Sequence, residues 1–278
     1  MTPEQELNQA PALPEVPADA IQPAKPRGIA PVWHTLVLVA AIGLLSLSGS
    51  ARIEGYARAP RHLRMYGATI VMQLLMLGWV ALGLRLRKVP FRSLFGMARK
   101  GWKALLIDIG IALAFWWCSL IILGVLNLAW LTADAAIHHR PLPIQTGKTH
   151  TMDPAQQETV RRVAVLAPSD GTEVAGWILL CIVVGFVEET VFRGYLQTQF
   201  TRWTHGKAAF GVVFSAIVFG AAHGYEGVRS MSLLAAYGVF FSLLALFRRS
   251  LRSCMIAHGW HDLFTGLTLM LLRSLHVV

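Results

Sequence analysis

Apolar residues follow one another along this chain in long blocks, and short polar stretches separate the blocks. Neither the two-residue period of a strand nor the period of an amphipathic surface helix runs through them. Blocks of about 20 residues are long enough for a helix to cross the hydrocarbon core of a bilayer. The pattern predicts an all-α fold, a polytopic transmembrane helix bundle with about seven to eight spans. Seven can be placed, near residues 30–49, 65–84, 104–130, 174–199, 208–224, 230–247 and 251–273.

Two segments fall outside these blocks. Residues 1–28 are polar and Pro-rich and lack the apolar region of a signal peptide, so they are predicted to form a disordered N-terminal tail. Residues 29–278 are then a single membrane-embedded helical domain. The long connection 132–170 contains DPAQQETVRRVAVLAP, which predicts a short amphipathic helix with Asp153 as its cap and Pro154 in its first position.

The composition agrees with a membrane protein. Of the 278 residues, 55% are hydrophobic and only 14% are charged, whereas soluble domains are about a quarter charged. The net charge of +10 comes largely from basic residues beside the apolar blocks, as in 85–103, where they can contact lipid headgroups. The charge therefore does not indicate a nucleic-acid partner. The three cysteines lie in apolar blocks without a CxxC pair, which is typical of buried packing residues.

The distribution of Lys and Arg also predicts an orientation. The N-terminal tail and the loops after the second, fourth and sixth spans carry more of these residues than the opposite side. Because basic loops stay on the cytoplasmic side, the N-terminus is expected in the cytoplasm. We expect a multi-pass protein of a bacterial inner membrane.

Ionisable residues inside the predicted spans are few, and burying each of them costs a few kcal/mol. A residue of this kind is therefore a candidate for function. They are Asp108, Glu188, Glu189, His223, His258, His261 and Asp262. Asp108 lies near Lys103 at the start of its span, where an interfacial residue with a local partner is expected. The loop histidines His138, His139 and His150 have irregular spacing and are expected to be solvated.

Helical geometry separates the two adjacent glutamates. Glu189 and Arg193 are four residues apart, so they share a face and are predicted to form an ion pair that braces the helix. Glu188 points about 100° away and remains free for another role. At a rise of about 1.5 Å per residue, Glu188, His223 and the pair His258–Asp262 come within about two helical turns of one another in depth.

Two kinds of chemistry fit these groups. A buried carboxylate and an imidazole around one water are sufficient for general-base hydrolysis, and a second polar pair could stabilise the oxyanion. Alternatively, Glu188, His223 and His258 could hold zinc with an open fourth position. Residue types and depths allow either arrangement.

Three motifs in order on successive spans resemble a known family. They are EETVFR (188–193, EExxxR), FGAAH (219–223, FxxxH) and HGWHD (258–262, Hxxx followed by Asn or Asp). The resemblance is to the CPBP intramembrane proteases, which include type II CAAX prenyl endopeptidases of the Rce1 type and bacterial bacteriocin-processing or immunity (Abi) proteins. It covers a catalytic core at 174–273, and RSLFG (92–96) is similar to the family's connection before its third span.

The resemblance implies an endopeptidase that acts on a peptide or protein substrate near or within the membrane. By carry-over, Glu188 and His223 activate the water, His258 and Asp262 support the oxyanion, and Glu189 and Arg193 brace the first motif. No cofactor is required in this glutamate-dependent mechanism, and zinc is the alternative. The chain has Asp262 where the CAAX enzymes have Asn, so this side chain must be protonated or must orient His258 instead. The adjacent His261 is a further candidate for that role.

Other classes of function keep the same residues. The chain lacks HExxH, GxSG and GxGD, the signatures of other intramembrane proteases. A non-catalytic membrane scaffold or immunity protein would use the polar groups to bind a partner. A transporter would use a Glu/His pair as a proton relay.

Overall fold

The computed structural model describes residues 28–49, 51, 54–55, 62–139 and 154–275. Within these residues the chain is helical, and the β-structure consists of one isolated bridge between Gly96 and Ser250. The prediction of an all-α fold is thus confirmed. The predicted tail lies outside the described residues except for its last residue, and His150 lies outside them as well.

The helices follow the predicted blocks closely. Their bounds are α2 Val32–Leu47, α4 His62–Leu86, α5 Trp102–Ile137, α6 Pro154–Ala164, α7 Gly171–Glu189, α8 Gln197–Trp203, α9 Ala208–Ala222, α10 Val228–Arg248 and α11 Arg252–Ser274. Two 3₁₀-helices, η3 (Phe91–Phe95) and η5 (Gly224–Glu226), lie in connections. A π-helical segment, η4 (Thr190–Leu196), continues α7 into α8. The short helix predicted after Asp153 is α6, although Asp153 itself is outside the described residues.

Each predicted span coincides with a helix, but not every helix is long and apolar enough to cross a bilayer. Four candidates meet both conditions within the described residues: α4, α5, the continuous segment Gly171–Trp203 and α10. The apolar helices α2 and α9 have only 16 and 15 residues, fewer than the about 20 that a full crossing needs. The chain is therefore an integral membrane helical bundle, with fewer full-length spans than predicted.

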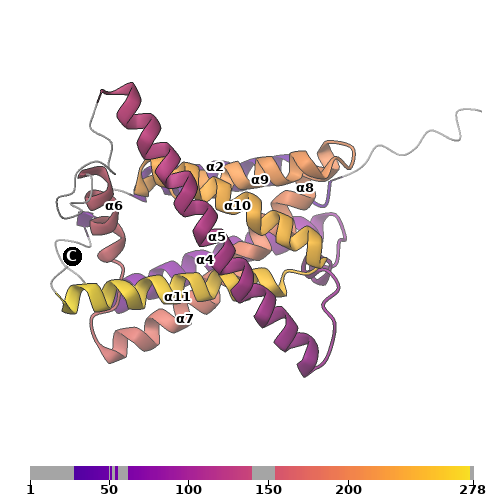
Figure 1. Ribbon diagram of the computed structural model, residues 1–278. Helices are drawn as coiled ribbons and strands as arrows, with labels where there is room; N and C mark the ends of the chain where they lie inside the picture. The colour runs from indigo at the N-terminus through magenta and orange to yellow at the C-terminus, as the bar shows by residue number, and fades with distance from the viewer. Residues whose placement is uncertain (1–27, 50, 52–53, 56–61, 140–153, 276–278) are drawn as a thin grey trace, which may run out of the picture.

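The helices form two layers (Figure 1). One layer contains α2, α9 and α10, and the other contains α4, α7 and α11. The long helix α5 crosses diagonally and packs on α10 and α11. The segment η4–α8 leaves the layer of α7 and packs against α9. This crossover carries the residues of the first motif between the two layers.

The start of α7 is fixed by reciprocal capping. Asp170 accepts a hydrogen bond from the backbone N–H of Glu173 at 2.9 Å. The Glu173 side chain accepts in turn from the backbone N–H of Ser169 at 2.8 Å. Capping of this type satisfies N–H groups that have no partner in the first helical turn. It defines where α7 begins and hence the depth at which Glu188 and Glu189 lie.

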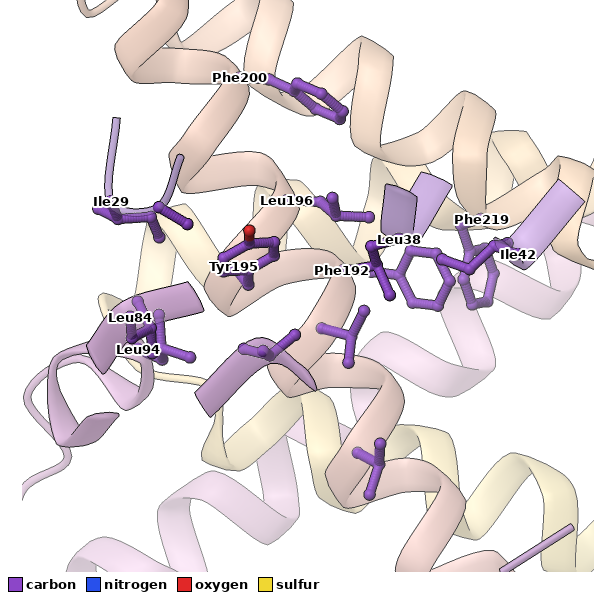
Figure 2. Packing of buried hydrophobic residues seen from close by; sticks show 14 residues of the cluster. Ile29, Leu38, Ile42, Leu84, Leu94, Phe192, Tyr195, Leu196, Phe200 and Phe219 are labelled. Atoms are coloured by element: carbon purple, nitrogen blue, oxygen red, sulfur yellow. The ribbon is translucent and has the colours of Figure 1, made fainter. Parts of the chain in front are cut away.

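Aromatic and aliphatic side chains enclose the crossover (Figure 2). Phe192, Tyr195, Leu196 and Phe200 project from η4 and α8 into the largest buried cluster. The cluster also contains Ile29, Leu38, Ile42, Leu84, Leu94 and Phe219. Because this core draws on α2, α4, η3 and α9, the π-helical segment is held from several sides.

The N-terminal segment is attached to the crossover by hydrogen bonds. The Gln199 side chain accepts from the backbone N–H of Ile29 at 2.6 Å and donates to the carbonyl of Ala30 at 2.8 Å. The Tyr195 hydroxyl lies 2.8 Å from the Thr35 hydroxyl and 3.1 Å from the His34 ring. These buried polar groups are satisfied by one another, which fixes η4 against α2.

Two glycines bring α7 and α11 into backbone contact. A Cβ atom on Gly185 would lie 2.9 Å from the backbone nitrogen of Gly259 and 3.1 Å from the carbonyl oxygen of Met255. Small residues at such crossings allow membrane helices to approach closely. The contact lies one turn from Glu188 and Glu189, so it sets their distance from α11.

We expect Gly185→Ala to separate α7 from α11 and to destabilise the protein by about 1–3 kcal/mol, the usual cost of overpacking. Gly78→Ala is the matched control, because a Cβ atom at Gly78 meets nothing within 4 Å. The thermal midpoint in detergent should fall for the first variant and not for the second. Equal midpoints for the two variants would show that the close approach is unimportant.

Candidate active site

A fully buried trio forms the inner part of the site. Arg193 Nη1 donates to Glu189 Oε1 at 2.9 Å, and His258 Nδ1 donates to the same oxygen at 2.7 Å. The side chains of Arg193 and Glu189 are 1% and 0% exposed. The Arg193 guanidinium also lies 4.3 Å from the Phe219 ring centroid and 4.9 Å from that of Phe241. The predicted ion pair is present, and His258 joins it.

Glu188 lies on the outer side of this trio. Its Oε1 accepts a hydrogen bond from Gln73 Nε2 of α4 at 2.8 Å. Its buried Oε2 has no hydrogen-bond partner among the described residues and lies 3.8 Å from His258 Nε2. Asp262 Oδ2 lies 3.7 Å from the same nitrogen. His258 is therefore held by Glu189 on one side and directs its other nitrogen toward two carboxylates.

His223 lies beside this centre rather than within it. It follows the last residue of α9, and its Nδ1 bonds the carbonyl oxygen of Phe219 at 2.9 Å. The Phe219 ring packs against both imidazoles, with ring centroids 5.0 Å from His223 and 6.1 Å from His258. Among the residues that the structure describes, no ion pair joins His223 to Glu188. His223 does interact electrostatically with Asp262.

The connection after α9 closes one end of the site. Its carbonyl at Tyr225 accepts a hydrogen bond from Arg162 of α6 at 2.8 Å. Tyr225 interacts electrostatically with Glu188 and Asp262. Burial raises the pKa of Glu226, which disfavours its negative charge next to those carboxylates. The short helix α6 thus contacts the same connection that carries His223.

His261 faces a different set of partners. Its Nδ1 accepts a hydrogen bond from the Trp116 indole of α5 at 3.2 Å. Its ring centroid lies 5.3 Å from that of Tyr237. With these partners, His261 joins α11 to α5 and α10, and no direct contact with Glu188 is present among the described residues.

Asp108 corrects one sequence-based interpretation. It is only 2% exposed and has distant partners instead of a local one. Its Oδ1 accepts from Arg248 Nη2 at 2.6 Å and from Ser253 Oγ at 2.9 Å. Its Oδ2 pairs with Arg252. The expectation of a local interfacial pair was wrong because α5 crosses the turn between α10 and α11, which supplies two guanidinium groups.

The zinc alternative requires Glu188, His223 and His258 to converge on one ion. Across the described ranges, no group of three or more His, Cys, Asp or Glu side chains is arranged to hold a metal ion. The Nδ1 atoms of both histidines are hydrogen-bonded, by Phe219 and by Glu189, which leaves Nε2 as the nitrogen for a ligand, as is usual in zinc-bound histidines. Zinc stays the alternative to the mechanism proposed below, which uses none.

Sequence reasoning missed Gln73 as a partner of Glu188. The residue is a single amide within an otherwise apolar stretch of α4, TIVMQLLML. A polar side chain in a membrane helix usually bonds a neighbouring helix, so this signal was present in the sequence. The hydrogen bond between His258 and Glu189 has no comparable signal in the sequence.

Comparison with known families gives one match. Residues 170–264 match the family model described as type II CAAX prenyl endopeptidase Rce1-like. The matched segment runs from the cap of α7 into α11 and includes all three motifs. The match is consistent with the CPBP family of intramembrane proteases and supports an endopeptidase in the membrane with a peptide or protein substrate. No curated protein and no solved structure matches the chain.

Proposed function

We propose that this protein is an intramembrane endopeptidase in which Glu188 activates water for attack on a peptide bond. The observation that carries the proposal is the asymmetric environment of the Glu188 carboxylate. Gln73 fixes one oxygen, while the other is buried, faces His258 and has no hydrogen-bond partner in the part of the chain that the structure describes. The 3.8 Å between Glu188 Oε2 and His258 Nε2 is too long for a direct hydrogen bond. A single water molecule can form hydrogen bonds to both groups.

The reaction follows from these positions. Glu188 Oε2 takes a proton from water as the water oxygen attacks the carbonyl carbon of the substrate. The carbonyl oxygen becomes an oxyanion, which accepts a hydrogen bond from His258 Nε2–H. When the intermediate collapses, the carbon–nitrogen bond breaks and Glu188 returns its proton to the leaving amine. Atoms and charges balance without a further reactant.

The inner trio prepares His258 for this role. The Glu189 carboxylate pairs with Arg193 and accepts a hydrogen bond from His258 Nδ1–H, which leaves Nε2 to face the reacting groups. Asp262 lies beside Nε2 and favours a hydrogen on that nitrogen. In this proposal an ionised Asp262 orients His258 and does not itself donate to the oxyanion. His223 lies beside the reacting groups and influences them through its electrostatic interaction with Asp262.

We further propose that the substrate is of the CAAX type, on the basis of the description of the matched family. The residues at the centre recognise a peptide carbonyl, and none of their contacts selects a prenyl group. We expect a membrane-associated peptide or protein as substrate.

Variants of the two histidines distinguish this mechanism from one in which Glu188 and His223 together activate the water. We expect His258→Ala to lower cleavage by about 10²–10⁴-fold, the contribution of a positioned acid or base. His223→Ala should lower it by a smaller factor, because no hydrogen bond or ion pair joins His223 to Glu188 among the described residues.

The measurement is mass spectrometry of new peptide ends in membranes from cells with and without the protein, at matched abundance of each variant. Ends that depend on His258 and largely persist in His223→Ala support the proposal. Failure to find any end that depends on the protein would favour the scaffold alternative instead.

A further inference from the structure

A basic pocket lies at the turn between α10 and α11, apart from the candidate active site. Its volume is about 350 Å³. The loop before α5 forms one wall and the end of α10 forms the other, with Arg99, Arg248 and Arg249 among the lining residues. In Figure 1 this turn lies at the right end of α10 and α11. The residues of the pocket therefore come from segments about 150 residues apart.

Backbone hydrogen bonds give the pocket a defined shape. Met97 N–H donates to the carbonyl of Arg249 at 2.8 Å, and Leu251 N–H donates to that of Phe95 at 3.2 Å. Gly96 between them has a positive φ of 70°, and a Cβ atom there would overlap the Arg249 carbonyl oxygen. Only glycine is accommodated at this point. The two walls are thus joined before any ligand binds.

The charge of the pocket is strongly positive. Asp108 is the acidic residue that lines it, and both of its oxygens are occupied by Arg248, Arg252 and Ser253. Arg99 and Arg249 are exposed, and neither has a hydrogen bond or ion pair from its side chain within the described residues. Two guanidinium groups therefore remain available for an anion, and each can bond two oxygens of a phosphate.

The rim of the pocket is apolar. Met97 is 79% exposed and Phe247 is 78% exposed. In a membrane protein, exposed side chains of this kind contact acyl chains or the interface. A ligand that fits both parts carries a phosphate next to hydrocarbon.

We propose that this pocket binds the phosphate headgroup of an anionic phospholipid, with the acyl chains against Met97 and Phe247. Arg99 and Arg249 contact the phosphate oxygens, and Arg248 contributes its charge while it remains paired with Asp108. A bound headgroup connects α5, α10 and α11 on the side where α11 begins, six residues before His258. The site is independent of the proposed catalytic chemistry.

The test uses the full chain, purified in an uncharged detergent. Its thermal midpoint is followed as phosphatidylglycerol, phosphatidylcholine or inorganic phosphate is added. Ligands that bind the folded state raise the midpoint with concentration, which yields an apparent affinity. Arg99→Gln/Arg249→Gln is the test variant, and Arg99→Gln alone is the second variant if the double one is unstable without lipid. Arg87→Gln is the matched control, because Arg87 is equally exposed but lies outside the pocket.

We expect phosphatidylglycerol to stabilise the wild type at a lower mole fraction than phosphatidylcholine. Each lost arginine should weaken the apparent affinity for phosphatidylglycerol by about fivefold, and Arg87→Gln should retain the wild-type affinity. Equal responses to the two lipids, or an unchanged affinity in the double variant, would overturn the proposal. Equal protection by inorganic phosphate would also overturn it and assign the pocket to a free anion.

Discussion

Replacement of Glu188 by glutamine should abolish peptide-bond cleavage and leave the helical bundle intact. Glutamine has the same shape and can still accept the hydrogen bond from Gln73, so the packing of α7 against α4 is preserved. It cannot take a proton from water at Oε2. Because a positioned general base contributes about 10²–10⁴-fold, we expect a loss of roughly 10³-fold in turnover.

The measurement compares variants at equal abundance in the membrane and with equal thermal midpoints. Glu54→Gln makes the same chemical change at an exposed residue and should retain full activity. Wild-type turnover in Glu188→Gln would remove Glu188 from the mechanism. A fall in both activity and midpoint would instead identify Glu188 as a structural residue.

Loss of Arg193 should have the largest effect on stability. Arg193→Met would leave the Glu189 carboxylate buried without its guanidinium, and the removal of one partner from a buried pair costs about 3–5 kcal/mol. The methionine cannot replace the cation contact with Phe219 and Phe241. We expect a marked fall in thermal midpoint and in membrane abundance.

A double variant separates charge from packing. Glu189→Gln/Arg193→Met removes both charges, so it should be more stable than Arg193→Met alone. Arg85→Met, at an exposed position near the end of α4, is the control and should be neutral. If the double variant were no more stable than the single one, the ion pair would not be the source of the effect.

The sequence was sufficient to predict the fold class and most helix positions. Long apolar blocks leave no alternative to helices in a bilayer, since every backbone polar group must be satisfied within the element. The four-residue spacing of Glu189 and Arg193 predicted their ion pair correctly, because both residues lie on a single helical segment. Seven spans were placed and four of the described helices qualify, because α2 and α9 are short and α11, although it has 23 residues, is not apolar enough.

Contacts between helices could not be predicted in the same way. The rotation of α7 against α11 depends on the close approach at Gly185 and on the π-helical crossover, and neither is visible in the hydropathy pattern. Spacing alone therefore could not show that His258 bonds Glu189 or that Phe219 packs against both His223 and His258. Asp108 was misinterpreted for the same reason, since its partners are contributed by the turn between α10 and α11.

The central claim is that Glu188 and His258 direct water to a peptide carbonyl. The most direct measurement incubates the purified protein in lipid nanodiscs with membrane peptides in ¹⁸O-labelled water and analyses the products by mass spectrometry. The account predicts new C-terminal carboxylates that contain ¹⁸O with the wild type and none with Glu188→Gln. Absence of labelled ends with the wild type, or their persistence in the variant, would contradict it.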